Sequence, residues 1–142
     1  MPNASRRQID CPSSQATDDD ARIFGMMTGA PEAHRVGYLT EALPVSDKLL
    51  ALAGSAKPTE LYRIAAPCAK GNCKHFKSNA CTLAQRIVDG IPAVVNALPA
   101  CQIRSTCRWF RQEGKAACVR CPQVMTDKPN ASDYEKQIAG AD

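Results

Sequence analysis

The segments PCAKGNCKHFKSNAC (residues 67–81) and ACQIRSTCRWFRQEGKAAC (residues 100–118) carry six of the eight cysteines of this 142-residue chain. In both, the middle cysteine is followed by a cation, a planar ring, a phenylalanine and a second cation, and an Ala-Cys pair closes the segment. A pattern written twice in so short a stretch indicates a duplicated ligand-bearing element. Each copy supplies three thiols, from Cys68, Cys73 and Cys81 in the first and from Cys101, Cys107 and Cys118 in the second.

The two remaining cysteines, Cys11 and Cys121, are each followed by proline. A Cys-Pro pair resembles the last ligand of the bacterial ferredoxin run, where that cysteine serves the other cluster of the protein. The sequence therefore predicts two four-cysteine sites, and it leaves open an exchange of Cys11 and Cys121 between them. The predicted sites are Cys11, Cys68, Cys73 and Cys81 for one, and Cys101, Cys107, Cys118 and Cys121 for the other.

The spacing of these cysteines favours iron-sulfur clusters over zinc. Thiolates suit zinc, Cu(I) and iron-sulfur clusters alike, so the ligand type alone selects no metal. Structural zinc sites usually pair cysteines two to four residues apart, and here only Cys118 and Cys121 have the two-residue spacing. A cubane cluster binds each sulfur at a different iron and tolerates wider gaps. We expect two [4Fe-4S] clusters, with two zinc ions as the alternative.

Positive charge is concentrated around the cysteines. The chain carries a net charge of +4, and residues 68–121 contain nine Lys or Arg against two carboxylates, a local balance of 9 − 2 = +7. A four-thiolate [4Fe-4S] centre carries a charge of about −2, which is costly at low dielectric unless cations lie nearby. The cations that adjoin Cys73 and Cys107 are placed to offset it, or they only solvate helix faces: Lys74, Lys77, Arg108 and Arg111.

Planar side chains occupy matched positions in the two copies. His75 is a possible ligand, but eight cysteines already fill two sites and its counterpart Trp109 cannot ligate a metal. We therefore expect His75 to pack or to form hydrogen bonds. Phe76 and Phe110 are expected to act as apolar lids that keep water off a cluster, and Trp109 to belong to the same wall.

The predicted fold is a small, mostly α, cysteine-rich, metal-stabilised domain with short irregular or minor β segments. Residues 1–17 are expected to be a mobile arm carrying Cys11, residues 18–125 a single globular domain with the duplicated unit (68–81 and 101–121), and residues 126–142 a tail. The apolar bridge 87–98 is expected to form the common core. Helices are predicted over 21–24, 47–53, 82–88, 92–98 and 104–112, and strands over 36–39 and 61–65.

The function that these features favour is electron transfer to or from a partner enzyme, rather than catalysis by the chain itself. No phosphate-binding glycine loop and no nucleophile elbow is present. A basic surface would attract an acidic redox partner over long range. The residues expected to form that surface are Arg104, Arg108, Arg111, Lys115 and Arg120.

Two alternatives use the same residues. If Cys11 does not ligate, the first site has an open iron position, and the chain is a cluster enzyme or an enzyme subunit. If the basic residues contact phosphates, it is a nucleic-acid-binding or regulatory metalloprotein with iron-sulfur or zinc, although no recognition-helix signature appears.

Cellular location bears on the state of the thiols. The first thirty residues lack the apolar run of a secretory signal, and no window approaches the roughly eighteen apolar residues of a membrane helix. We expect a cytoplasmic protein without membrane contact. Thiols stay reduced in the cytoplasm, where many cysteines indicate metal binding more readily than disulfides.

Overall fold

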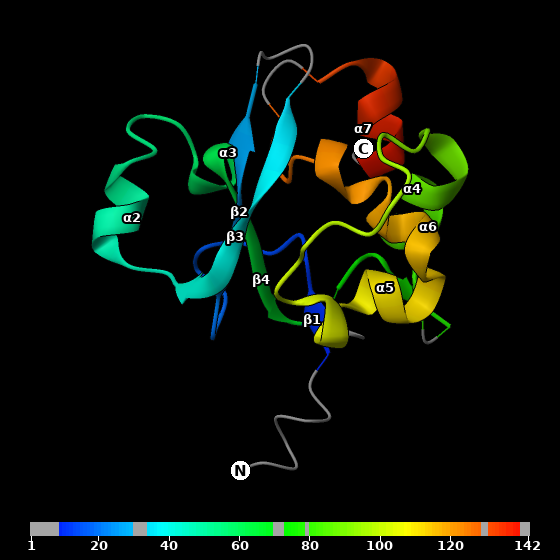
Figure 1. Cartoon of the computed structure of the whole chain (residues 1–142), viewed down its shortest axis with the longest axis horizontal. Helices are drawn as coiled ribbons and strands as arrows, with labels where there is room; N and C mark the ends of the chain where they lie inside the picture. Colours follow the sequence, from blue (N-terminus) through cyan, green and yellow to red (C-terminus); the bar gives the residue numbers. More distant parts are fainter. Residues whose placement is uncertain (1–8, 30–33, 70–72, 79, 129–130, 140–142) are drawn as a thin grey trace.

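A four-stranded antiparallel sheet forms the centre of the protein, in a computed structural model that describes residues 9–29, 34–69, 73–78, 80–128 and 131–139. The strand order is β1-β4-β2-β3, and β5 and β6 pair as a separate two-stranded ribbon. Helices α4 to α7 lie together on one side of the sheet, and α2 and α3 lie on the other (Figure 1). The strands are β1 (Asp10–Cys11), β2 (Arg22–Thr28), β3 (Arg35–Pro44), β4 (Tyr62–Pro67), β5 (Phe76–Lys77) and β6 (Ala80–Cys81).

Most helices are short. Ser46 caps the predicted helix at residue 47, where its hydroxyl oxygen accepts from the backbone N–H of Leu49 at 3.2 Å. The helices predicted over 47–53 and 82–88 are confirmed as α2 and α4. The helical elements are α2 (Asp47–Ala51), α3 (Pro58–Leu61), α4 (Thr82–Gly90), the 3-10 turn η3 (Arg104–Thr106), α5 (Arg108–Glu113), α6 (Lys115–Cys118), the 3-10 turn η4 (Cys121–Gln123) and α7 (Asp133–Ala139).

The prediction of a mostly α domain is wrong, because 34% of the described residues are helical and 25% are in strands. A helix is expected over residues 21–24, but residues 22–24 belong to β2, which pairs with β3 on one side and β4 on the other. Hydrogen bonding to a neighbouring strand on both edges outweighs the weak helix preference of this short segment. Both pairings shift register between Ile23 and Gly25, which is a bulge that directs Phe24 into the core.

The predicted helix over 92–98 is also wrong. This segment is irregular, and the side chains of Val95 and Leu98 are 39% and 44% exposed. One backbone hydrogen bond ties the segment to the end of α6: the N–H of Val94 donates to the carbonyl of Val119 at 2.9 Å. The C-terminal part of the expected core bridge therefore lies on the surface, whereas Ile87 at its start belongs to the core.

Two hydrophobic clusters lie on the two faces of the sheet, and successive residues of one strand contribute to different clusters. On β4, Ile64 packs with Ile23 and Tyr62 toward α2 and α3, and Ala65 packs with Phe24 toward the cysteine-rich half. The cluster on the cysteine-rich side also contains Ile87, Ile103, Cys107 and Trp109. The cysteine-bearing half is thus packed directly onto the sheet.

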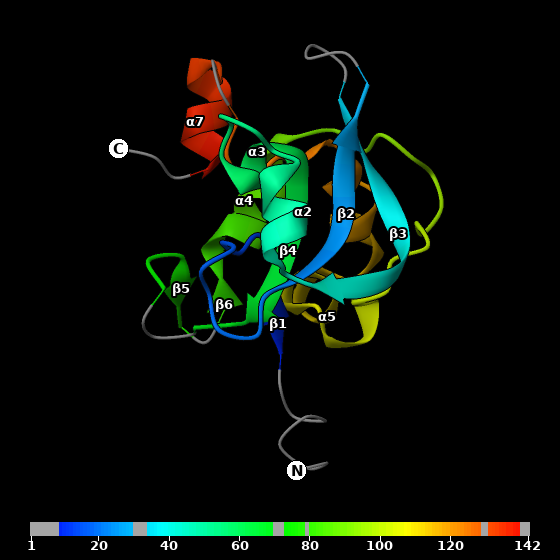
Figure 2. The same ribbon diagram turned by 90° about the vertical axis from the view of Figure 1, so that its left-hand side faces the viewer.

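Segments near both ends of the chain join this body. Residues 1–8 of the expected arm lie outside the described residues, whereas Asp10–Cys11 pair with β4. In the expected C-terminal tail, α7 packs beside α4, as Figure 2 also shows. The carbonyl of Ile138 in α7 accepts from Arg86 Nε of α4 at 2.7 Å.

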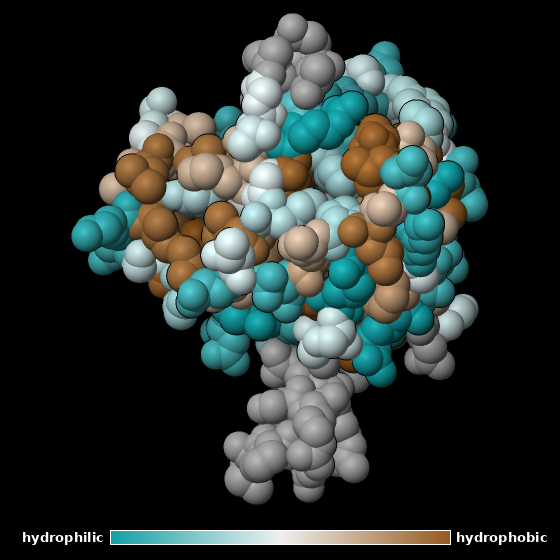
Figure 3. All heavy atoms as spheres, viewed as in Figure 1, coloured by the Kyte–Doolittle hydropathy of each residue, from teal (hydrophilic) through white to brown (hydrophobic). Residues whose placement is uncertain are grey.

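The face of the molecule seen in Figure 3 is polar except for a few apolar areas. Apolar side chains gather over α2 (Figure 3), where Leu52 is 64% exposed. Within the described ranges, no helix combines the length and the hydropathy needed to cross a lipid bilayer.

A substitution at Gly25 tests the close approach of β2 and β3. A Cβ at Gly25 would lie 2.5 Å from Cγ1 of Val36, a stiff, buried side chain, whereas a Cβ at Gly37 meets its nearest neighbour at an ordinary 3.5 Å. We expect Gly25→Ala to lower the free energy of unfolding by about 1–3 kcal/mol. Gly37→Ala, the matched control, should change it by less than about 0.5 kcal/mol in urea denaturation. Equal effects of the two variants would contradict the packing described.

Candidate functional site

The eight cysteines line two cavities, four in each. The first site is a cavity of about 880 Å³, and the second site is a compact cavity of about 20 Å³. All eight cysteines are free thiols. Cys11, Cys68, Cys73 and Cys81 line the first site, and Cys101, Cys107, Cys118 and Cys121 line the second. Cys11 therefore lies with the thiols of the first copy and Cys121 with those of the second. The exchange that the sequence left open does not occur in this structure.

Strands deliver most of the thiols of the first site. Cys11 ends β1 and pairs with Ala66 of β4, which brings it beside Cys68 just past the end of that strand. The N–H of Cys68 donates to the carbonyl of Ile9 at 2.7 Å. Cys81 ends β6 and is the N-cap of α4. Antiparallel pairing therefore places thiols that are far apart in sequence next to one another.

Helical turns deliver most of the thiols of the second site. Cys107 is the N-cap of α5, Cys118 is the last residue of α6 and Cys121 is the first residue of η4. Cys101 follows the exposed segment 92–98, and its N–H donates to the carbonyl of Pro99 at 2.9 Å. The two copies of the sequence pattern thus use different secondary structure to gather four thiols.

Backbone N–H groups point at sulfur in both sites. The N–H of His75 lies 3.4 Å from Cys73 Sγ, and the N–H of Ala84 lies 3.5 Å from Cys81 Sγ. In the second site the amides of Phe110 and Trp109 act on Cys107 in the same way. Donors of this kind favour the thiolate over the thiol. They are part of the backbone and are in place before any ligand arrives.

Burial opposes the ionisation of the cysteine thiols. It raises the pKa of Cys11, Cys81, Cys101 and Cys118, and it raises the pKa of Cys107 to about 12. Backbone N–H groups and, at Cys118, the side chain of Arg104 only partly offset this effect. These thiols therefore hold their protons at neutral pH unless a cation displaces them, as a thiophilic metal does.

Arg63 of β4 is a buried charge at the edge of the second site. Its guanidinium donates to the carbonyls of Pro12, Cys121 and Val124 at 2.8–3.2 Å, and Nη1 lies 3.2 Å from Cys121 Sγ. It also lies over the rings of Phe24 and Trp109, 5.3 Å and 5.5 Å from their centroids. Burial opposes its charge, but the neighbouring Cys121 and Tyr38 raise the pKa of Arg63. Within the described part of the chain it forms no ion pair with a carboxylate.

Three buried N–H donors at the two sites have no hydrogen-bond acceptor among the described residues. They are Nε of Arg104, Nε of Arg108 and Nε1 of Trp109. Arg104 lines the second site, Arg108 lines the first, and Trp109 lines both. The indole N–H is close enough to Cys81 to oppose the rise in the pKa of that thiol, although it makes no hydrogen bond of normal length.

In each site an arginine of the second copy stacks on the phenylalanine that lines that site. Arg104 lies over Phe110 at 5.9 Å, and Arg108 lies over Phe76 at 5.2 Å. The stack holds the guanidinium against an apolar ring, a contact that stabilises a partly desolvated cation. The two phenylalanines thus support a cation at each site, a role beyond that of the expected lids.

His75 forms a hydrogen bond with Arg86. A guanidinium can only donate, so His75 Nδ1 is the acceptor at 2.9 Å and the neutral ring carries its proton on Nε2. Burial, followed by the charges of Arg86 and Lys74, lowers the pKa of His75. In this state neither ring nitrogen offers a free lone pair to a metal.

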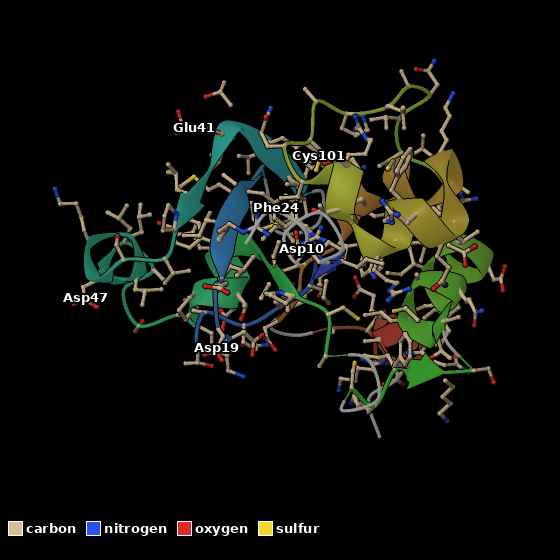
Figure 4. All side chains as sticks on the ribbon, turned by 90° about the horizontal axis from the view of Figure 1, so that it is seen from below. Asp10, Asp19, Phe24, Glu41, Asp47 and Cys101 are labelled. Carbon is tan, nitrogen blue, oxygen red and sulfur yellow. The ribbon has the colours of Figure 1, made fainter. Side chains whose placement is uncertain are left out.

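Asp10 connects the two sites. It is buried beside Cys11, and its Oδ2 accepts from Arg22 and from the Thr106 hydroxyl, both at 2.6 Å. Thr106 precedes Cys107, and a β-bridge joins Asp10 to Cys107. Figure 4 shows Asp10 and Phe24 at the centre of the molecule, between the sheet and the helices.

The cysteines of both sites are suitable ligands for a thiophilic metal or cluster. The two cavities differ in volume. Within the described ranges, no three His, Cys, Asp or Glu side chains converge as a site for a single metal ion. The sulfurs of a tetrahedral zinc site lie about 3.8 Å apart. The second cavity has room for roughly one water molecule, so a [4Fe-4S] cluster fits there only if its thiols move outward. The first cavity is large enough for such a cluster.

The predicted basic surface is only partly exposed. Arg104 and Arg108 stack on phenylalanines, and Arg120 donates to the carbonyls of Ile91 and Ala116 at 2.6 Å and 2.8 Å. Arg111 and Lys115 are exposed. Three of the five cations are therefore half-buried, and two of these, Arg104 and Arg108, line the sites.

No protein-family model, no curated protein and no solved structure matches this chain. The class of the site follows from its own residues: two four-thiol cavities that share the side chain of Trp109. Sequence reasoning missed Arg63, Phe24 and Tyr38. A charged residue inside the otherwise apolar strand YRIAAP was the one available signal for Arg63.

The raised pKa of Cys107 predicts a loss of stability at alkaline pH. Below the ordinary value of 9.0 the thiol is protonated in both the folded and the unfolded chain; above it only the unfolded chain releases the proton until pH approaches about 12. The free energy of unfolding of chelator-treated, reduced protein should therefore fall by up to about 1.4 kcal/mol per pH unit in this window. Denaturant unfolding at pH 8.5 and 10.5 measures it. Cys107→Ser should lose less, and an equal loss would contradict the assignment.

Proposed function

We propose that the chain is an iron-sulfur protein that holds two [4Fe-4S] clusters and passes single electrons to or from a partner enzyme. The observation that carries the proposal is the division of eight thiols into two cavities of four. Four thiolates are the ligand set of a [4Fe-4S] cluster. The first cavity has room for such a group, and the second would reach the same state by outward movement of its thiols.

The unpaired buried donors support a sulfide-containing group over a bare ion. A buried N–H without an acceptor costs free energy, about 1–3 kcal/mol for each group. Cluster sulfides and ligand thiolates are acceptors, and hydrogen bonds to sulfur are among the factors that tune iron-sulfur centres. The residues that carry these donors, Trp109, Arg104 and Arg108, line the two cavities.

The buried Arg63 charge supports the same proposal. A charge removed from water is strongly unfavourable unless an opposite charge or a full set of hydrogen bonds compensates for it. Carbonyl oxygens and Cys121 Sγ surround Arg63. A four-thiolate cluster of charge about −2 would supply the missing counter-charge.

The electron-transfer role rests on the side chain that the two sites share. Trp109 is 1% exposed and lines both cavities, so two clusters would lie against the same indole. Exposed Arg111 and Lys115 would attract an acidic partner. A chain that relays electrons needs no further catalytic groups.

A cluster enzyme is the second candidate, and the size of the first cavity favours it. At about 880 Å³ this cavity is within the range of small-molecule binding sites, and it offers more space than its four thiols need. In that case Cys11, on the short edge strand β1, would not ligate, and one iron would bind substrate.

Metal analysis tests the cofactor. Protein purified without oxygen should be brown and should contain about eight iron and eight sulfide ions per chain, as two cubanes require. Plasma emission spectrometry, a sulfide assay and an absorption spectrum measure this. Colourless protein, or protein with stoichiometric zinc and no sulfide, would remove the cluster proposal.

Single cysteine variants distinguish the two candidate functions. If Cys11 is a ligand, Cys11→Ser should lose about half of the iron, and Cys101→Ser, the matched variant in the second site, should lose the other half. Iron content and the electron paramagnetic resonance spectrum of the reduced protein report this. A Cys11→Ser protein that keeps its full iron and spectrum would favour the enzyme with an open iron site.

A further inference from the structure

The first cavity is built from several parts of the chain, and most of its wall is not thiol. It encloses about 880 Å³, which is within the volume range of small-molecule binding sites. Described residues from four stretches line it together with Cys11, namely 13–19, 67–91, 108–109 and 123–139. The cavity therefore has space for a molecule in addition to its four cysteine side chains.

One wall of this cavity is aliphatic. Its side chains come from α4, from the residue that follows α4, and from α7: Leu83, Ile87, Ile91 and Ile138. All four belong to, or pack against, the hydrophobic cluster that contains Trp109. Apart from Ile87, they are only half-buried. An apolar molecule lying along this wall would remove further apolar surface from water, which is favourable.

Arg108 supplies a positive charge to the same cavity. Its guanidinium lies over the ring of Phe76 at 5.2 Å, and both residues line the cavity. Among the described residues, Nε of Arg108 has no acceptor and its guanidinium forms no ion pair with a carboxylate. A half-buried cation of this kind favours an anionic ligand. A carboxylate matches the planar fork of a guanidinium with two parallel hydrogen bonds.

The acidic residues of the lining come from other walls than Arg108. Two precede β2 and two belong to the C-terminal segment: Asp18, Asp19, Asp127 and Glu135. Figure 4 shows Asp19 well away from the yellow and gold helices α5 and α6. Glu135 pairs with a lysine of its own segment, Lys128. The negative charges of the lining therefore leave Arg108 accessible to an anion.

We infer that the first cavity binds a small organic carboxylate, with its carboxylate group at Arg108 and its apolar body along α4 and α7. The inference goes beyond the proposed function, and it assumes no metal ion or cluster in either site. A guanidinium has five N–H donors, so Arg108 can bind a carboxylate even where its Nε–H faces sulfur.

Calorimetric titration of the reduced, full-length protein tests the inference with octanoate as the probe. Octanoate should bind at one site per chain. Octanamide has the same apolar body without the charge and should bind about tenfold more weakly, because hydrogen bonds between charged partners are the stronger ones. Absence of octanoate binding, or equal affinity for octanamide, would overturn the inference.

The length of the probe tests the aliphatic wall. From butanoate to octanoate, each added CH2 group that becomes buried should tighten binding by up to about fourfold. An affinity that does not change with chain length would show that the charge alone holds the ligand, and would overturn the placement along α4 and α7.

Replacement of Arg108 tests the anchor. Arg108→Gln should bind octanoate about tenfold more weakly and octanamide as the wild type does. Arg35→Gln removes the same charge from an exposed position on β3, outside the lining, and should change neither affinity. Equal losses in the two variants would overturn the assignment to Arg108. If Arg108→Gln does not fold, the wild-type comparison of octanoate with octanamide decides.

The emission of Trp109 gives a second readout in metal-free protein. Trp109 is the single tryptophan of the chain and lines the cavity. Octanoate should change its fluorescence over the same concentration range as the calorimetric titration. Binding that leaves the emission unchanged would place the ligand elsewhere and would overturn the inference.

The proposed function and this inference fail in different ways. Protein that lacks iron and sulfide but binds octanoate would remove the cluster proposal and support the carboxylate site. Protein with full iron and sulfide that does not bind octanoate would leave the cluster proposal intact and overturn the carboxylate site alone.

Discussion

The buried guanidinium of Arg63 is the constraint on which the arrangement of the protein depends. It projects from a central strand of the sheet, and its donors reach Pro12, Cys121 and Val124. These segments are remote in sequence, so one side chain ties the N-terminal strand and the last cysteine to the middle of the fold. A charge in this position is stable only while its hydrogen bonds persist.

The duplicated sequence pattern is built on two different scaffolds. The first copy lies among strands and the second among short helices, yet both gather four thiols, backbone donors and an arginine stacked on phenylalanine. Within each copy, the ring and the cations next to the middle cysteine follow from the order of residues along the chain. Packing around Trp109, which lines both cavities, joins the two sites.

Short-range signals were reliable where a cap or a strong amphipathic pattern was present. Ser46 and Gly90 mark the start of α2 and the end of α4 as predicted. The same reasoning failed at residues 21–24 and 92–98. In the first case pairing with two neighbouring strands decided the conformation, and in the second an exposed chain bounded by Pro92 and Pro99 gained nothing from a helix.

The sequence by itself determined the number of thiols, their division into two copies, and the cation and ring beside each middle cysteine, because these depend only on order and spacing along the chain. The tertiary structure alone decided that Cys11 joins the first copy and Cys121 the second. It also decided that Arg63 lies beside the second site, and that three arginines expected on the surface are half-buried. Such placements depend on strand pairing and burial between segments as far apart as Asp10 and Thr106, and no local pattern encodes them.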